Sequence, residues 1–395
     1  MVIYLDNSAT TPVKKEVIDE MIPYFTEFYG NPSSLYKLSR DTKRKLEDAR
    51  ERVATLLGAD KDEIYFTASG TESDNWAIKQ MARVNKKKGN HIITTKIEHH
   101  AVLHACEEME KEGFEVTYLD VDSEGKISLD DLKESIKDTT VLITIMYANN
   151  EIGVIMPIAE IGKIAREKGI AFHTDAVQAV GKLTIDVKKE NIDMLSLSGH
   201  KFNGPKGIGA LYVRKGIRIN SFMHGGGQER GKRAGTENVP GIIGLTKAFE
   251  VSTENREEKN KKVVELRDYL IERVLGEIQY SRLNGHRTDR LPNNANFCFR
   301  FIEGESLLLA LDNFGICASS GSACTSGSLD PSHVLLAIGL PHEIAHGSLR
   351  LSLSDETTKE ELDFTVEKLK TVVERLRDMS PLWEDFLKNG GEDNV

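Results

Sequence analysis

The sequence predicts an α/β fold with a mostly parallel central sheet and a smaller α+β unit. Three observations lead to this prediction. Between residues 63 and 213, apolar runs of strand length alternate with helix-like stretches, which is typical of a parallel sheet covered on both faces. After about residue 256 this alternation gives way to a mixture of strands and helices. With 395 residues, the chain is also long enough to form two hydrophobic cores.

The individual elements follow from hydrophobic runs and from Gly or Pro breaks between them. Strands are expected at residues 63–67, 91–95, 115–119, 141–147, 170–175, 192–197, 208–213, 296–301 and 316–319. Helices are expected from residue 13 to about 29, at 39–57, from about 70, from about 99, at 129–137 and, as one long charged helix, at about 240–275. We place the change of domain within that last helix.

Composition excludes several classes of protein. The formal net charge of −10 argues against direct nucleic-acid binding, which needs a basic surface. The longest apolar run, near residues 141–148, is too short to cross a bilayer. The N-terminus lacks a secretory pattern, so we expect a cytoplasmic protein without membrane contact. Four cysteines in a chain of this length do not form a disulfide framework.

Lys201 is the first candidate for chemistry. It lies between two apolar, strand-like runs and is followed by a Gly/Pro-rich turn, so it is held between rigid elements. A lysine in such a place can condense with an aldehyde once its pKa falls below about 10.4. Ser198 and His200 can contribute hydrogen-bond donors to an anion beside it. On this stretch alone, a solvated loop lysine remains an alternative.

Asp175 and Gln178 strengthen the interpretation of Lys201. Asp175 ends the strand that precedes the one leading to Lys201. Pyridoxal phosphate requires a lysine, an anion at its ring nitrogen and donors for its phosphate. Asp175 supplies the anion, and Gln178 can hydrogen-bond the phenolic oxygen of the ring. An isolated Asp at a strand end is often a turn residue, but Asp and Lys on successive strand ends form a more specific pair.

The loop Ala68-Ser69-Gly70-Thr71-Glu72-Ser73 connects a strand to a helix. Its backbone N–H groups and the Thr71 hydroxyl can bind the cofactor phosphate, because a helix N-terminus favours an anion. A plain helix cap is the alternative. Ligands bind at the carboxyl ends of parallel strands, where His99 and Asn149 also fall. An imidazole at His99 can lie on the ring and move protons, although a surface cap remains open for it.

Cys324 lies in the loop Ala318–Ser328, which is small, polar and Gly-containing and therefore unlike a core segment. A thiolate in such a loop can carry a group from one place to another. The other cysteines, Cys106, Cys298 and Cys317, accompany apolar residues and are predicted to pack. Arg350, on a strand-like segment, can clamp a carboxylate in bidentate fashion; an ordinary salt-bridging arginine is its alternative.

With these residues in place, the chain resembles the cysteine desulfurases of the NifS/IscS type, which are pyridoxal-phosphate enzymes with the aspartate-aminotransferase-like fold (fold type I). The resemblance runs nearly end to end, and its most specific parts are Ser198–Phe202 and Ser319–Ser326. It implies a large cofactor-binding domain at residues 14–256 and a small domain at residues 1–13 and 257–395 that carries the cysteine loop. The implied reaction converts L-cysteine to L-alanine and leaves the sulfur on Cys324 as a persulfide.

The same resemblance implies a role for each site residue. Lys201 binds the cofactor covalently and removes the α-proton, His99 stacks on the ring, and Cys324 takes the sulfur. Asn149 and Arg350 face the substrate carboxylate. The implied cofactor-binding set is Gly70, Thr71, Asn149, Asp175, Gln178, Ser198, His200, Lys201 and, from the second subunit of a homodimer, Thr236. The expected sulfur acceptor is an iron–sulfur scaffold protein or a tRNA-thiolating enzyme, and Cys324 is a candidate transient ligand of an iron–sulfur cluster.

Rival functions remain to be compared. A selenocysteine lyase or another pyridoxal-phosphate enzyme, such as an aminotransferase, would share the cofactor, although an aminotransferase has no need of the loop cysteine. From a different class, His342-Glu343-Ile344-Ala345-His346 matches the zinc-protease pattern H-E-x-x-H. Pro341 and Gly347 bracket that motif and leave room for little more than one helical turn, so a zinc metallohydrolase is disfavoured.

Overall fold

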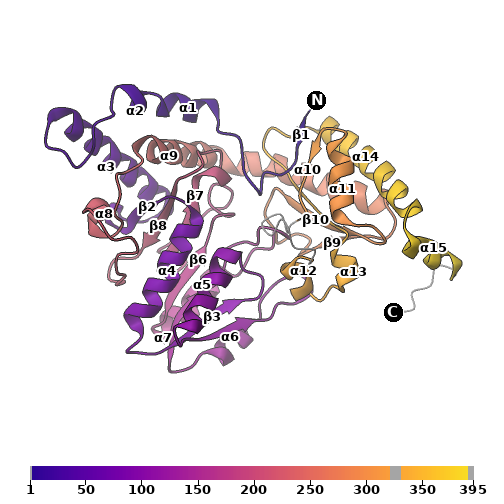
Figure 1. Ribbon diagram of the computed structural model, residues 1–395, viewed down its shortest axis with the longest axis horizontal. Helices are drawn as coiled ribbons and strands as arrows, with labels where there is room; N and C mark the ends of the chain where they lie inside the picture. Colours follow the sequence, from indigo (N-terminus) through magenta and orange to yellow (C-terminus); the bar gives the residue numbers. More distant parts are fainter. Residues whose placement is uncertain (1, 321–330, 390–395) are drawn as a thin grey trace.

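The computed structural model describes residues 2–320 and 331–389, and its central feature is a mostly parallel sheet (Figure 1). Within these residues seven strands form the sheet, in the order β2-β8-β7-β6-β5-β3-β4. All are parallel except β8, which is antiparallel to both of its neighbours. Their bounds are Ile64–Thr67 (β2), His91–Thr95 (β3), Glu115–Leu119 (β4), Thr140–Thr144 (β5), Ala171–Asp175 (β6), Met194–Ser198 (β7) and Gly209–Val213 (β8). The predicted α/β class is confirmed.

Helices cover both faces of this sheet (Figure 1). One face packs against α4 and α5 in a core that includes Trp76 and Met109, and the other packs against α3, α7 and α9 in a core that includes Leu46, Ile161 and Leu245. The helices of this part are Lys15–Met21 (α1), Pro23–Thr26 (α2), Lys37–Leu57 (α3), Gly70–Asn85 (α4), His100–Lys111 (α5), Leu129–Ser135 (α6), Ile158–Lys168 (α7), Gln228–Gly231 (α8) and Val239–Thr253 (α9).

The C-terminal part has its own antiparallel sheet, in the order β12-β10-β9, and a hydrophobic cluster between this sheet and its helices. Ile3 and Leu5 belong to that cluster, because β1 pairs in parallel with β11 and draws the N-terminus into this part. The elements are Ile3–Tyr4 (β1), Arg256–Glu277 (α10), Ser281–Asn284 (β9), Asn294–Phe299 (β10), Gly304–Asp312 (α11), Ile316–Cys317 (β11), His333–Ala337 (α12), His342–Ala345 (α13), Ser348–Ser352 (β12), Lys359–Asp378 (α14) and Pro381–Lys388 (α15).

The structure corrects two expectations about the elements. The long helix predicted at about residues 240–275 is two helices, because Asn255 adopts a left-handed conformation with φ 50° that interrupts the helical backbone. The helix predicted from residue 13 to about 29 is also two short helices, α1 and α2, with Pro23 at the start of the second. The described residues contain no helix that is both long and apolar enough to cross a membrane.

Candidate active site

A cavity of about 340 Å³ lies at the carboxyl ends of β6 and β7 and brings together most of the predicted site residues. Parallel strands place their carboxyl ends at one edge of a sheet, so side chains from distant loops meet there. Its wall consists of Ser8, Ala9, Ser69, Gly70, Thr71, Asp74, His99, Met146, Ala148, Asn150, Asp175, Val177, Gln178, Ser198, His200, Lys201 and Arg350.

Lys201 ends a single 3₁₀ turn, Gly199–Lys201, that follows β7 directly. Its Nζ donates hydrogen bonds of 2.7 Å to the carbonyl oxygens of Ser8 and Ala9. The amine is therefore held against the N-terminal segment, inside the cavity and within the influence of the Asp175 carboxylate. This position matches the requirement for a lysine that reacts with a carbonyl group.

Asp175 is the last residue of β6 and is 7% exposed. Burial raises the pKa of its carboxyl to about 6, although the Val177 N–H, 2.9 Å from Oδ1, and the Lys201 ammonium act in the opposite direction. A cationic N–H group in the cavity would favour the ionised carboxylate. Asp175 therefore has the environment expected of a partner for a protonated ring nitrogen.

Asp74, on α4, is a second buried acid beside Asp175, and it was not predicted from the sequence. Burial, together with the charge of Asp175, raises the pKa of Asp74 well above the ordinary range. The imidazole of His173 lies beside it, with Nε2 3.6 Å from Asp74 Oδ1, and burial lowers the pKa of that imidazole to about 3. His173 is therefore neutral and gives Asp74 no positive charge, so burial and the neighbouring Asp175 both disfavour the ionised form of Asp74.

The part of the cavity at the N-terminus of α4 is suited to a phosphate. Ser69 caps α4 by accepting a hydrogen bond from the Glu72 N–H at 3.1 Å, so Gly70 and Thr71 form the first turn of a 16-residue helix. A Cβ at Gly70 would lie 2.6 Å from Val177 Cγ2, so the backbone here packs closely against the sheet edge. The unpaired N–H groups and the dipole of such a helix end attract an anion.

Ser198 and His200 also line the cavity. Burial and nearby lysines, Lys201 foremost, lower the pKa of His200 to about 4, so the imidazole is neutral and can donate one hydrogen bond. Its Nδ1 is 3.1 Å from Thr10 Oγ1. Thr236, by contrast, lies outside this cavity and lines a separate one with Ala68.

Gln178 and His99 complete the walls. Gln178 Nε2 donates to the Ser8 carbonyl at 2.9 Å, while its buried Oε1 has no hydrogen-bond partner in the structure. His99 caps α5: its Nδ1 accepts the Ala101 N–H at 3.1 Å, so the neutral ring carries its proton on Nε2. Burial, followed by the charge of Lys201, lowers the pKa of His99 to about 4.

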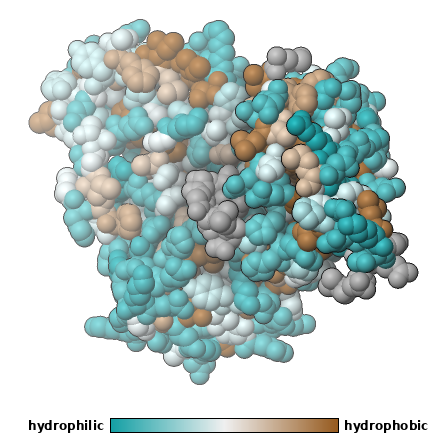
Figure 2. Space-filling model, turned by 45° about the vertical axis from the view of Figure 1, so that its right-hand side comes forward, coloured by the Kyte–Doolittle hydropathy of each residue, from teal (hydrophilic) through white to brown (hydrophobic). Residues whose placement is uncertain are grey.

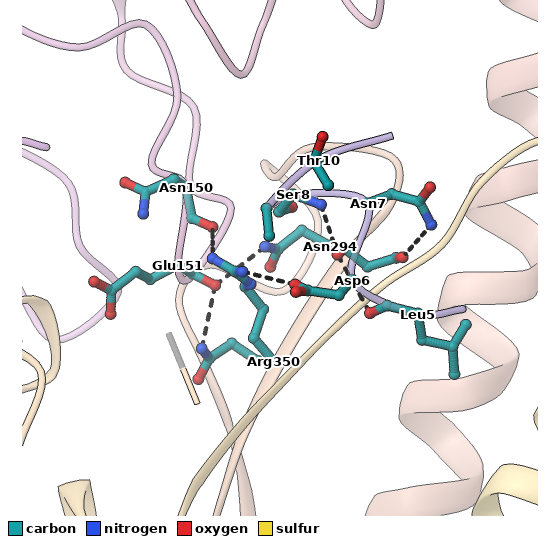
Figure 3. A network of polar contacts seen from close by, with 12 residues as sticks. Leu5, Asp6, Asn7, Ser8, Thr10, Asn150, Glu151, Asn294 and Arg350 are labelled. Atoms are coloured by element: carbon teal, nitrogen blue, oxygen red, sulfur yellow. Dashed lines mark hydrogen bonds and ion pairs between the residues drawn. The ribbon is translucent and has the colours of Figure 1, made fainter. Parts of the chain in front are cut away.

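Arg350, on β12, lines the cavity, and Figure 3 shows its guanidinium in contact with Asp6 and Asn150. Its Nη2 is 2.8 Å from Asp6 Oδ1, and its Nη1 donates to the Asn150 carbonyl at 3.0 Å. Nε is buried without a hydrogen-bond partner. The guanidinium is thus fixed at two nitrogens while retaining a donor for a further acceptor.

The N-terminal segment that carries Asp6 is itself tied to β12. Asn7 Nδ2 donates to the Ser352 carbonyl at 2.8 Å, and the Ser8 N–H donates to Ser352 Oγ at 2.9 Å. Residues 6–10 contact Lys201, Gln178, His200 and Arg350 together, and these contacts were not predicted from the sequence. A short run of small and polar residues, Asp6-Asn7-Ser8-Ala9-Thr10, was the available signal.

Asn149 is not where the sequence analysis expected it, because its side chain does not line the cavity. Its Nδ2 donates to the Ile97 carbonyl at 2.8 Å, and its Oδ1 accepts the N–H groups of Glu151 and Ile152. The amide is therefore used to hold its own loop together. The next residue, Asn150, lines the cavity instead, and we assign the substrate-side position to it.

Cys324, the predicted sulfur carrier and candidate cluster ligand, lies outside the described residues. The segment before it is hydrogen-bonded to the cavity wall: Arg350 N–H donates to the Ser319 carbonyl at 2.6 Å. Cys106 and Cys298 are fully buried, as predicted, and burial raises the pKa of both thiols, that of Cys298 to about 11. Cys317 is half-buried, and burial raises its pKa as well.

The zinc-protease motif does not form a metal site in the described part of the chain. His342–Ala345 is a four-residue helix, too short to place both imidazoles of H-E-x-x-H on one face. Among the residues that the structure describes, no group of three or more His, Cys, Asp or Glu side chains is arranged to hold a metal ion.

The comparisons with known proteins agree with this fold and cavity. Residues 3–364 match the family described as aminotransferase class-V. A cysteine desulfurase IscS from Clostridium botulinum is 59% identical over 392 residues, which cover 99% of each chain. Among solved structures, a NifS-like protein matches with a TM-score of 0.90 at 39% identity, covering 95% of this chain and all of that one. SspA in complex with cysteine matches with a TM-score of 0.80 at 39% identity, covering 90% and 100%.

The chain is therefore a member of the aminotransferase class-V family, with the fold of the type I pyridoxal-phosphate enzymes. Within that family it belongs to the cysteine desulfurases of the NifS/IscS type.

Proposed function

We propose that this chain is a cysteine desulfurase that binds pyridoxal 5′-phosphate, converts L-cysteine to L-alanine and transfers the sulfur to Cys324. The observation that carries the proposal is the single cavity that Lys201, Asp175, the α4 N-terminus and Arg350 share. The first three provide a carbonyl-reactive amine, an anion and a phosphate cradle, and the fourth provides a carboxylate clamp. The full-length likeness to cysteine desulfurases supports the same conclusion.

The residues present fit the cofactor. Gln178 Oε1 is a buried polar atom without a partner, and the backbone at Gly70 is packed too closely for a side chain, as expected of a preformed cradle. We assign the phosphate to Gly70, Thr71, Ser198 and His200, the ring nitrogen to Asp175, and the ring oxygen to Gln178. When bound, pyridoxal phosphate acts as an electron sink for the bonds around the substrate α-carbon.

Arg350 and Asn150 are assigned to the substrate. The contacts with Asn150 and Asp6 use one N–H of Nη1 and one of Nη2, so three of the five guanidinium N–H groups remain for the carboxylate of an amino acid. A charge-assisted contact of this kind, buried from water, orients the substrate as well as binding it. SspA, one of the related solved structures, was determined in complex with cysteine, which agrees in chemical class with this assignment.

Lys201 and His99 are assigned to proton transfer. The Lys201 amine is held in the cavity by the Ser8 and Ala9 carbonyls, which accept its hydrogen bonds and orient it. We assign to it the removal of the substrate α-proton. His99 remains neutral throughout the neutral pH range, with a pKa of about 4, so its Nε2–H lies over the cavity as a donor rather than as a cation.

Cys324 is assigned to sulfur transfer. Its thiolate attacks the substrate sulfur, so that a sulfur–sulfur bond forms as the carbon–sulfur bond breaks. The electron pair of the broken bond passes to the substrate carbon, which takes a proton and becomes the methyl group of alanine. The persulfide is then delivered to an acceptor, for which an iron–sulfur scaffold protein and a tRNA-thiolating enzyme are the candidates; transient ligation of a cluster by Cys324 belongs to the same proposal.

The active form is proposed to be a homodimer. Apolar and aromatic side chains on the N-terminal helices and the loop after them are exposed, and Figure 2 shows hydrophobic surface at its upper left, where these helices lie. Monomeric proteins seldom leave such a patch uncovered. The patch consists of Ile18, Ile22, Phe25, Tyr29, Leu35 and Tyr36. Because Thr236 lies outside the cavity of its own chain, we assign it to the phosphate of the second subunit.

We also keep the division into a large domain at residues 14–256 and a small domain at residues 1–13 and 257–395 as a proposal. The separate hydrophobic cluster that joins Ile3 and Leu5 to the C-terminal helices supports it. Limited proteolysis of the chain, followed by mass measurement of the stable fragments, tests the boundary near residue 256.

The test of the function is a product assay. The purified protein, loaded with pyridoxal phosphate, is given L-cysteine and a thiol reductant, and alanine and sulfide are measured together. Equal amounts of the two products are expected, and a Cys324→Ala variant is expected to bind the cofactor normally while releasing almost no sulfide. If cysteine changes the cofactor absorption band but neither product forms, the proposal is contradicted. The same assay with selenocysteine tests the alternative of a selenocysteine lyase, which would prefer that substrate over cysteine.

A further inference from the structure

A second cavity lies behind Lys201, on the side away from the cofactor cavity, and has a volume of about 100 Å³. It forms where the N-terminal segment and the end of α9 meet the start of α10 and the loop after β12. Lys201 lines both cavities, so the two share a wall. The proposed function makes no use of this second cavity.

The charges around the second cavity are unbalanced. Of the residues that the structure describes, the basic ones that line it are Lys14, Lys182, Lys201, Arg256 and Lys259, whereas the acidic one is Asp355. Lys14 pairs with Asp355 at 2.7 Å, which accounts for the carboxylate. An excess of positive charge on such half-buried side chains around one cavity is unfavourable unless a counter-ion balances it.

Lys201 lies within the influence of the Asp175 carboxylate, and the other three cations have contacts to neutral oxygen atoms. Lys182 Nζ donates to the carbonyls of Gln178 and Lys201, at 3.2 and 3.3 Å, and Lys259 Nζ donates to the Val251 carbonyl at 2.9 Å. Arg256 contacts the Leu183 carbonyl and the Thr184 hydroxyl. Carbonyl and hydroxyl dipoles orient these side chains without neutralising them.

Two further observations point to a ligand. Burial and the nearby Lys201 lower the pKa of Lys182 to about 7. A bound anion beside Lys182 would stabilise its ammonium form and raise this pKa. Asn293, which is 5% exposed and lines the cavity, has a buried Oδ1 without a hydrogen-bond partner. A ligand with both negative charge and an O–H or N–H donor would satisfy the cations and this acceptor together.

We propose that this second cavity is a binding site for a small oxyanion that also carries a hydrogen-bond donor, of the size of hydrogen phosphate or of a short amino or hydroxy acid. Lys182 and Lys259 supply positive charge, and Asn293 accepts from the protonated oxygen or nitrogen. Anion binding in this cavity does not depend on the proposed reaction. The effect of the anion on catalysis does rest on the proposed function of Lys201: an anion beside Lys201 would favour the protonated amine and slow removal of the substrate α-proton.

The experiment is calorimetric titration of the cofactor-loaded protein, in a buffer free of phosphate, with inorganic phosphate and, separately, with L-lactate and acetate. Loading keeps the cofactor's own phosphate site filled. Saturable binding of one anion per chain is expected for phosphate or lactate, weaker for acetate, which lacks the donor. The anion that binds more tightly identifies the source, phosphate or organic acid. Absence of saturable binding by all three anions would overturn the proposal.

Matched variants locate the site. Lys182→Met and Lys259→Gln are expected to weaken binding about tenfold or more, since each removes a charge-assisted contact. Lys189→Met removes an exposed lysine, 85% accessible and paired with Asp186, and is expected to leave the affinity unchanged. If Lys182→Met perturbs folding or cofactor loading, Lys259→Gln carries the test alone. Equal affinities in Lys259→Gln and Lys189→Met would refute the assignment to this cavity.

Discussion

The two sides of the candidate active site are built in different ways. On the sheet side, Asp175 and Lys201 lie at or just after the ends of neighbouring strands, and their positions follow from the local chain direction. On the opposite side, Arg350 is fixed by Asp6, 344 residues away in the sequence. The sheet side binds the proposed cofactor and the Arg350 side the proposed substrate. The difference implies that changes on the first side abolish chemistry, whereas changes on the second mainly alter substrate affinity.

The largest effect is expected on the sheet side, from Lys201→Ala. Loss of the amine removes both the covalent link to the cofactor and the general base, so kcat should fall by at least about 10³-fold. The visible absorption band of the lysine-linked cofactor should also be absent from the purified variant. Lys189→Ala, an exposed lysine, serves as the control. Retention of the band in Lys201→Ala would remove Lys201 from its assigned role.

The same contrast explains how much the sequence revealed. A strand pattern followed by a polar residue is a local signal, and it located Asp175, Gln178, Ser198, His200 and Lys201 correctly at one cavity. The length and spacing of the apolar runs also predicted the alternation of strands and helices. Strands of a parallel sheet are buried on both faces, so each one is a nearly continuous apolar run in the sequence.

Features that depend on pairing between distant segments were not visible. Asp6 contacts Arg350, and Ser8 contacts Lys201. Both contacts depend on the hydrogen bonds that join the N-terminal segment to β12. Asn149 and Asn150 are adjacent and identical in type, so the sequence alone gave no reason to choose the second. Only the hydrogen bonds that occupy the Asn149 amide separate them.

The next effect, on the Arg350 side, distinguishes the clamp from its support. Arg350→Lys keeps the charge but loses the planar donor set, so we expect KM for cysteine to rise about 10²-fold with a smaller change in kcat. Asp6→Asn should raise KM less, because it removes an anchor of the guanidinium rather than the donor itself. Steady-state kinetics gives KM and kcat for cysteine in the two single variants and in the double variant.

Coupling between the two substitutions is the decisive quantity. Since Asp6 acts through Arg350, their effects on kcat/KM should not add in the double variant. Additive effects would show that Asp6 supports the fold and not the clamp. A fall in kcat with an unchanged KM in Arg350→Lys would contradict the separation of the two sides.

A moderate effect on stability is expected from Asp175→Asn in the cofactor-free protein. The pKa of Asp175 is about 6 in the folded chain, above its ordinary value of 3.8, so between these pH values the folded state binds more protons than the unfolded state. The free energy of unfolding therefore falls as pH rises from about 4 to about 6, and the cost of ionising the buried carboxyl persists above pH 6. Asn removes the penalty, so the variant should be more stable by about 1–3 kcal/mol above pH 6 and similar near pH 4.

Thermal or urea unfolding of both proteins at pH 4.5 and pH 8 measures the difference. The stabilised variant should nevertheless have lost most of its activity once the cofactor is added, since the ring nitrogen has no anion. Such a trade-off is typical of functional sites. Equal stability of the two proteins at pH 8 would show that the Asp175 carboxylate is already balanced without the cofactor, and would weaken its assignment.

The smallest expected effect tests how tightly the sheet side is packed. Alanine at Gly70 would place a Cβ 2.6 Å from Val177 Cγ2, so Gly70→Ala should destabilise the protein by about 1 kcal/mol, despite the better helix propensity of alanine. In a Val177→Ala background the clash is absent, and the same substitution should become neutral or stabilising. Urea unfolding of the four proteins gives the coupling directly. A Gly70→Ala variant that is stable in both backgrounds would mean that Val177 moves freely, and that this side of the cavity is as adaptable as the Arg350 side.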